Sequence, residues 1–138
     1  MSPSIERTIA GKAKELVEQR KEETERHENE SEYRALCESF PILLRSAGLA
    51  QSVAFLRAKG AENRKAKEKN SYAHLYDHLQ QQFRNLQFLS GAEALSERAA
   101  SPQLAASEYR LYTEIAMRIA LWHKRMAQAM LRQRKAKP

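Results

Sequence analysis

The sequence predicts an all-α protein, a compact single-domain bundle of five or six helices over residues 1–138. Glycine and proline are scarce, with four of each, and no run of β-branched residues suggests a strand. Hydrophobic residues make up 42% of the chain, which is enough for one core. Apolar stripes recur at helical spacing over 33–44, 72–86 and 104–129, and these stripes must bury against one another.

The N-terminal region begins with an amphipathic helix over residues 4–17. Residues 18–32 contain no large apolar side chain. Pairs such as Lys21–Glu25 could hold a solvated helix there, and a frayed or looped segment fits the sequence equally well. The apolar side of the first helix carries Ile5, Ile9, Leu16 and Val17.

The second helix is predicted to begin at Ser31 as its N-cap, with a kink or a restart at Pro41. Gly48 stands where a left-handed C-terminal cap is needed, so the helix should end there. A short third helix follows and should end at Gly60. The apolar positions are Tyr33, Leu36, Cys37, Phe40 and Leu44 in the second helix, then Leu49, Val53, Phe55 and Leu56 in the third.

The fourth helix follows an exposed basic connection over residues 57–70, which has no large apolar side chain. Asn70 or Ser71 should cap this helix. Its helical period continues through about residue 89. The positions that carry the period are Tyr72, Leu75, Tyr76, Leu79, Phe83 and Leu86.

The last helix should be the longest. A short turn or helix is expected first, around residues 92–100. Ser101 and Pro102 then supply an N-cap and a first-turn proline, which is a typical start signal. Residues 132–138 form a basic tail. The helix itself carries Leu104, Leu111, Ile115, Ile119, Trp122, Met126 and Ala129 at helical spacing.

The charge of the chain points to a polyanionic partner. Lysine and arginine total 24 against 17 acids, giving a formal charge of +7. Residues 1–32 hold nine acids and six bases, whereas residues 33–138 hold 18 bases and eight acids. A surplus of this kind suits a nucleic acid or an anionic membrane surface, although a solvated surface that aids solubility also explains it. The positive field belongs to the later part of the chain.

The expected compartment is the cytoplasm. The single cysteine, Cys37, excludes an internal disulfide and fits a reducing environment. The first residues lack the apolar stretch of a signal peptide, and no segment reaches the roughly 20 apolar residues of a membrane span. We therefore expect no membrane partner.

Chemistry-bearing motifs are sparse, and we expect no enzyme, cofactor or metal. His74 and His78 are four residues apart, a spacing that can chelate a metal on a helix. The zinc-protease glutamate after the first histidine is missing, so two surface histidines are the simpler interpretation. Cys37 shares the phase of the core stripe, which predicts a packed thiol and not a nucleophile. A metal-dependent enzyme using the two histidines remains as an alternative.

Two segments of the chain carry recognisable motifs. The first covers residues 31–59, with Leu-Arg-Ser-Ala-Gly-Leu-Ala-Gln over 44–51 at its centre. The second joins Ser-Glu-Tyr-Arg-Leu-Tyr-Thr at 107–113 to Ala-Leu-Trp-His-Lys-Arg-Met-Ala at 120–127. Together they cover about half of the chain, and in this order they resemble the small helical subunit of the type III-B CRISPR–Cas effector, the Cmr complex.

The resemblance implies a non-catalytic subunit that stacks in several copies beside the backbone subunits of a guide-RNA complex. Its expected partners are guide RNA, target RNA, the other Cmr subunits and copies of itself, while RNA cutting is assigned to other subunits. The aromatic residues fall on core phases, so RNA contact should be with the phosphate backbone. The bases expected to face RNA are Arg45, Arg57, Lys59, Arg110, Lys124 and Arg125.

A free-standing helical nucleic-acid-binding protein is the alternative function. Such a protein would bind duplex DNA alone, with sequence preference. No recognisable helix-turn-helix spacing supports this alternative.

Overall fold

The computed structural model describes residues 3–23, 27–62 and 70–132. These residues form six helices, and no strand occurs among them, which confirms the predicted all-α fold. In chain order the helices are α1 (Pro3–Glu23), α2 (His27–Ala47), α3 (Leu49–Ala61), α4 (Ser71–Asn85), α5 (Leu95–Ala99) and α6 (Ala106–Met130).

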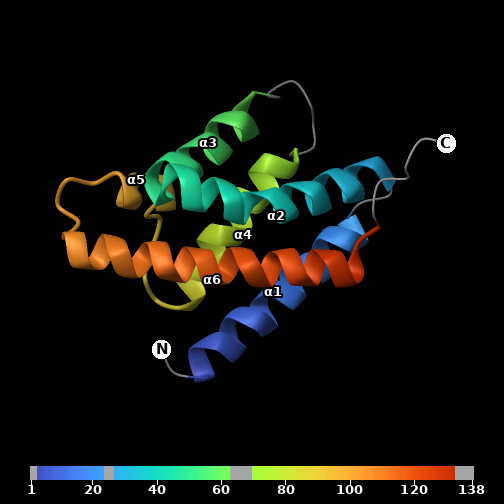
Figure 1. Ribbon diagram of the computed structural model, residues 1–138, viewed down its shortest axis with the longest axis horizontal. Helices are drawn as coiled ribbons and strands as arrows, with labels where there is room; N and C mark the ends of the chain where they lie inside the picture. Colours follow the sequence, from blue (N-terminus) through green and yellow to red (C-terminus); the bar gives the residue numbers. More distant parts are fainter. Residues whose placement is uncertain (1–2, 24–26, 63–69, 133–138) are drawn as a thin grey trace.

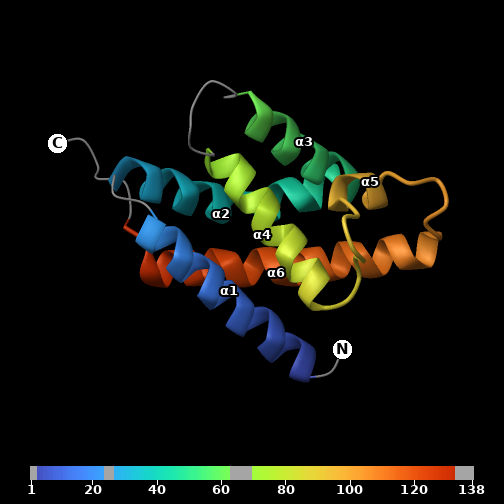
Figure 2. The same cartoon turned by 180° about the vertical axis from the view of Figure 1, so that it is seen from behind.

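The long helix α6 organises the bundle. Helix α2 lies antiparallel beside it, and α1 crosses its other flank (Figure 1). Helix α4 lies behind these helices in Figure 1 and in front of them in Figure 2, which shows the molecule from behind. It contacts α1, α2, α3 and α6. Helices α3 and α5 cover the remaining flank of α4.

The predicted apolar stripes meet in one core. Each stripe supplies fully buried side chains, and α1 adds a fourth row, because its apolar positions face α6 and α4. The thiol of Cys37 belongs to this core, as its helical phase predicted. The core includes Ile9 and Val17 of α1, Tyr33, Phe40 and Leu44 of α2, Leu75, Leu79 and Phe83 of α4, and Ile115 and Ile119 of α6.

The polar stretch after residue 17 is helical wherever the structure describes it. Helix α1 continues to Glu23, and residues 24–26 lie outside the described part of the chain. Arg20 explains the extension, because it is buried and its guanidinium carbon lies 5.7 Å from the ring centroid of Tyr33. A residue that the sequence pattern assigns to solvent thus anchors the end of this helix.

Two predicted helix starts are wrong. Helix α2 begins at His27, so Ser31 lies inside it. Of the kink or restart predicted at Pro41, the structure excludes the restart, because α2 continues through that residue. Helix α6 begins at Ala106, because the hydroxyl of Ser101 accepts the N–H of Gln103 in a local turn instead of capping a helix. The boundary at residue 48 is correct.

Gly48 joins α2 to α3 with a positive φ of 83°. Its N–H donates to the carbonyl of Leu44 over 3.0 Å, and its own carbonyl accepts the N–H of Ser52 over 3.1 Å. Glycine is favoured here because other residues strain at this φ. Helix α3 then passes Gly60 and ends one residue later than predicted, at Ala61.

Two predicted core positions are more exposed than their phase suggests. Leu111 is 42% exposed and Phe55 is 39% exposed. Phe55 nevertheless packs edge-on against Tyr72, with ring centroids 5.8 Å apart. A helical period therefore located the stripes but not the edges of each buried face.

Asn70 links the end of α3 to the start of α4, and its removal should destabilise the fold. Its Oδ1 accepts the N–H of Ala73 over 2.9 Å, which confirms the predicted cap, and its Nδ2 donates to the carbonyl of Lys59 over 2.9 Å. We expect Asn70→Ala to lower the free energy of unfolding by about 1–2 kcal/mol in urea denaturation. Asn70→Asp keeps the cap and loses the donor, so it should cost less; an equal loss would contradict the capping role.

Candidate nucleic-acid interface

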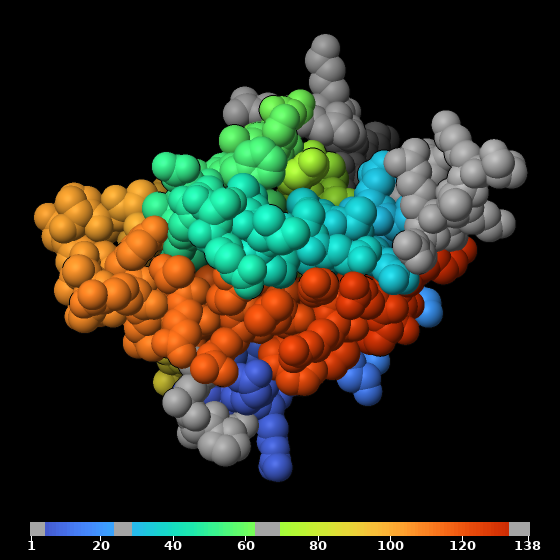
Figure 3. Space-filling model, viewed as in Figure 1, coloured from blue at the N-terminus to red at the C-terminus, as the bar shows by residue number. Residues whose placement is uncertain are grey.

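The predicted RNA-facing bases fall into two groups. Arg45 lies near the end of α2, and Arg110, Lys124 and Arg125 lie on α6. These two helices form one broad face of the molecule, shown in Figure 3. Arg57 and Lys59 lie on α3 instead. We call Arg45, Arg110, Lys124 and Arg125 the α2–α6 bases.

The spacing along α6 aligns its bases. Arg110 and Lys124 are fourteen positions apart, which corresponds to about 21 Å along the axis and about 40° around it. Arg125 lies about 60° from Arg110 on the other side. All three side chains therefore leave the same side of the helix, as contact with an extended phosphate chain requires.

Nearby acids do not cancel this charge. Glu114 pairs with Arg118 over 3.2 Å, and Glu38 pairs with Arg34 over 3.3 Å. By contrast, Arg45, Arg110 and Lys124 form no ion pair with any residue that the structure describes. Glu38 and Glu114 thus already have partners, whereas Arg45, Arg110 and Lys124 have no ion pair within the described ranges, so these three bases are available to a phosphate chain.

Trp122 fixes the position of Arg125. The guanidinium carbon of Arg125 lies 5.3 Å from the Trp122 ring centroid. The indole N–H of Trp122 donates to Glu6 of α1 over 2.7 Å, and Arg118 donates to the same carboxylate over 3.2 Å. The hydrogen bond from Trp122 lowers the pKa of Glu6, with Arg118 adding to the effect against the opposing effect of burial. Trp122 thus ties α6 to α1 through Glu6.

Arg57 and Lys59 already have partners within the chain. Arg57 donates to the hydroxyl of Ser96 over 2.8 Å and lies 3.7 Å from Glu97, which ties α3 to α5. Lys59 lies 3.5 Å from Glu62. These exposed contacts are weak, yet they make both bases less available than the α2–α6 bases.

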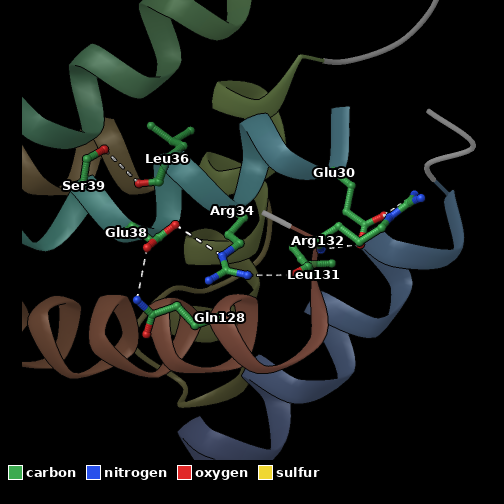
Figure 4. A network of polar contacts seen from close by, with 8 residues as sticks. All are labelled: Glu30, Arg34, Leu36, Glu38, Ser39, Gln128, Leu131 and Arg132. Atoms are coloured by element: carbon green, nitrogen blue, oxygen red, sulfur yellow. Dashed lines mark hydrogen bonds and ion pairs between the residues drawn. The ribbon is translucent and has the colours of Figure 1, made fainter. Parts of the chain in front are cut away.

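The C-terminal end of α6 is held against α2 by a polar cluster (Figure 4). Glu30 is only 1% exposed in its side chain and accepts hydrogen bonds from the backbone and guanidinium N–H groups of Arg132 over 2.7–2.9 Å. Arg34 donates to the carbonyl of Leu131 over 2.9 Å. Burial opposes ionisation of Glu30, but the Arg132 hydrogen bonds outweigh it and lower the pKa of that carboxyl. The cluster anchors Arg132 just after the end of α6, and the sequence pattern did not identify it. The other residues of the predicted basic tail, 133–138, lie outside the described part of the chain.

The interpretation of His74 and His78 as two surface histidines is wrong for His78. Its ring is 5% exposed, and its Nδ1 is hydrogen-bonded to the hydroxyl of Tyr33. His123 is fully buried beside it, with ring centroids 5.9 Å apart. Within the described ranges, no three His, Cys, Asp or Glu side chains gather into a metal-binding group. Two of these histidines thus belong to the packed interior.

Burial also defines the chemistry of Cys37. Loss of solvent raises the pKa of its thiol to about 12. A thiol of that pKa stays protonated at neutral pH, in agreement with a packing role. None of the described helices has the length and apolar character of a membrane span.

Comparison with known proteins supplies a family. Residues 5–130 match the family model described as CRISPR-associated protein (Cas_Cmr5). The fold is similar to the crystal structure of a CRISPR-associated Cmr5 family protein from Thermus thermophilus, with a TM-score of 0.68 and 28% sequence identity. That similarity covers 91% of this chain and 99% of the Thermus chain. No curated protein sequence matches significantly.

Proposed function

The chain belongs to the Cas_Cmr5 family of CRISPR-associated proteins, and from this premise we propose that it is the non-catalytic small subunit of a type III-B CRISPR–Cas (Cmr) ribonucleoprotein. In this role it stacks in several copies beside the backbone subunits and contacts the backbone of guide or target RNA. The family match over residues 5–130 is the observation that carries the proposal.

The α2–α6 bases support the proposed contact with RNA. Three of them have no ion-pair partner among the described residues, and Arg125 is positioned by Trp122. Groups of this kind neutralise phosphates and release counterions, so the contact should weaken with salt. Because these bases lie on a helical surface without converging acids, they can bind a phosphate chain but offer no means to cleave it.

Co-purification with partner subunits tests the proposal. We expect the protein to co-elute with guide-loaded Cmr subunits at about 150 mM salt and to dissociate from RNA as salt rises. The isolated protein should bind naked RNA or DNA only weakly in a gel shift, because one copy offers few phosphate contacts. Failure to co-elute would refute the subunit role.

Tight, sequence-selective binding of duplex DNA by the isolated chain would favour the free-standing binder instead. The same gel shift, run with duplex DNA of several sequences, separates the two functions. We expect no sequence preference, since the bases in question are spaced for phosphates and not for base edges.

A further inference from the structure

The seam between α2 and α6, on the face shown in Figure 3, carries an exposed apolar side chain. Ile42 of α2 is 67% exposed, more than either of the other two exposed large hydrophobic residues that the structure describes. A single exposed hydrophobic residue is common on protein surfaces and needs no function. The residues that surround Ile42 therefore determine whether it belongs to a binding site.

The register of the two antiparallel helices places Lys124 beside Ile42. Gln128 of α6 donates to the carboxylate of Glu38 of α2 over 3.1 Å, so these two residues lie at the same level of the seam (Figure 4). Ile42 and Lys124 are each four positions from this contact, so both lie about 6 Å further along the seam. Each lies within about 40° of the contacting residue around its own helix, so both side chains leave on the side of the seam.

Arg45 and Leu121 form the next level of the seam. Each is seven positions from the contact between Glu38 and Gln128, which is about 10.5 Å along the seam and about 20° around the helix. Leu121 is half-buried and, within the described ranges, is not one of the residues that pack against the core. The two levels alternate, because an apolar residue of one helix lies beside a base of the other. We call Ile42, Arg45, Leu121 and Lys124 the seam patch.

The two bases of the seam patch are available to a negatively charged ligand. Arg45 is exposed, and neither Arg45 nor Lys124 forms an ion pair with any residue that the structure describes. The acid nearest to them by register, Glu38, is already engaged by Arg34 and Gln128. The patch thus combines an aliphatic surface with a cation on either side of it. This combination suits a ligand that has a flat apolar body between two anionic groups, as a nucleotide within a strand does.

A protein segment is a poorer match to the seam patch. A stable protein interface buries about 800 Å² on each partner around an apolar centre. Two aliphatic side chains supply only a small part of such a centre, but they suffice to cover the face of one nucleobase. A base within a duplex is stacked on its neighbours and cannot lie on the protein, whereas an unpaired base can be splayed out from the strand.

We propose that the seam patch holds one unpaired nucleotide of a bound RNA strand. The nucleobase lies on Ile42 and Leu121, and the phosphates on its two sides accept hydrogen bonds from Arg45 and Lys124. The contact tolerates any sequence, because every base has such a face. This inference rests on the proposed RNA-binding function and adds the class of RNA that the surface takes, a single strand and not a continuous duplex.

Methyl NMR of the full-length protein tests the seam patch with single-stranded oligoadenylate as the probe. We expect a ring-current shift of the Ile42 δ1 methyl, while the δ1 methyl of the fully buried Ile119 stays in place. An abasic oligoribonucleotide of the same length should shift the Lys124 amide but not the Ile42 methyl. It should also bind about fivefold more weakly, the lower end of what contact with one base contributes on aromatic surfaces. An RNA duplex should behave like the abasic strand.

A matched pair of variants separates the seam patch from exposed apolar surface in general. Ile42→Ser should weaken oligoadenylate binding about fivefold, followed through the Lys124 amide, and should leave binding of the abasic strand unchanged. Leu111→Ser removes another exposed apolar side chain of α6, which lies about 15 Å from Leu121 along the helix and about 80° around it. This control should change neither affinity. Circular dichroism checks that both variants remain helical.

Four outcomes would overturn the assignment. The first is an Ile42 methyl that does not shift at millimolar oligoadenylate, and the second is an equal shift with the abasic strand. The third is an equal shift with the duplex. The fourth is a shift only with an acidic, leucine-containing peptide, which would make the seam patch a protein-docking surface instead.

Failure of the seam patch can be separated from failure of the proposed function. If the Ile42 methyl does not respond but the protein co-elutes with guide-loaded Cmr subunits, the subunit role stands and the seam patch assignment falls. If the methyl responds as expected but co-elution fails, the seam patch stands as a single-strand site and the subunit role falls.

Discussion

Acidification to about pH 4.5 should lower the free energy of unfolding by about 2–3 kcal/mol through one buried imidazole, that of His123. Burial lowers the pKa of His123 from 6.5 to about 4. In the unfolded chain the His123 imidazole binds a proton near pH 6.5, whereas in the folded chain it binds that proton only near pH 4. The stability is therefore fully present above pH 6.5 and is lost progressively as the pH falls through this window.

The hydrogen bonds around His123 strengthen this expectation. The side-chain amide N–H groups of Gln82 point to the carbonyl of Ile9 and to Nε2 of His123, each over 3.1 Å. That arrangement makes Nε2 an acceptor, so a proton on Nε2 would face another donor in the core. Protonation therefore loses a hydrogen bond in addition to the cost of burying charge.

Urea denaturation across the pH range measures this effect. The His123→Gln variant cannot titrate at this position, so the difference between wild type and variant isolates the contribution of His123. Glu6 and Glu30 have lowered pKa values and add an acid-dependent loss of their own, but theirs falls mainly below pH 4.5. Parallel curves for the two proteins between about pH 6.5 and pH 4.5 would contradict the assignment.

The features that could be predicted are those encoded locally. The apolar stripes, the glycine at residue 48 and the cap at Asn70 each depend on a few neighbouring residues, and the structure confirms all three. The family resemblance is confirmed as well, because residues 5–130 match the Cas_Cmr5 family model. The prediction from local residues was wrong at Ser101. A helix start signal is present there, but the Ser101 hydroxyl accepts a hydrogen bond within a turn instead of capping a helix.

The features that could not be predicted depend on partners distant in sequence. Glu30 is buried because it meets Arg132, 102 positions away. His78 is buried because it meets Tyr33, 45 positions away. A helical period gives the face of a single helix, but it does not show which polar residue on that face finds a partner. Polar residues in the interior therefore emerge only from the tertiary structure.

The same distinction applies to the candidate site. Sequence reasoning grouped six bases as equivalent, because charge and motif position were the available signals. The structure separates them by partner: Arg57 is engaged with Ser96, whereas Lys124 has no ion pair among the described residues.

Reversing two α2–α6 bases should weaken RNA association of the assembled complex by about a hundredfold. In the double variant Lys124→Glu/Arg125→Glu, two attractions to phosphate become repulsions next to each other on α6. The slope of log affinity against log salt should also fall by about 1.4–1.8, since two phosphate contacts are lost. The helix should remain intact, because Lys124 has no ion pair among the described residues and Arg125 stacks on Trp122 from an exposed position. Circular dichroism checks the fold, and filter binding at several salt concentrations measures the affinity.

A charge-matched control shows whether the loss of RNA affinity depends on the position of the substituted bases or on the net charge of the protein. Arg7→Glu/Lys14→Glu makes the same change in net charge at exposed positions of α1, on the flank of α6 opposite α2. If the α2–α6 bases carry the contact, this control should lose only a few-fold in affinity, because Arg7 and Lys14 are expected to make no phosphate contact of their own. Equal losses in the two variants would mean that the chain attracts RNA through overall charge alone. Unchanged affinity in Lys124→Glu/Arg125→Glu would place the RNA contact elsewhere on the protein.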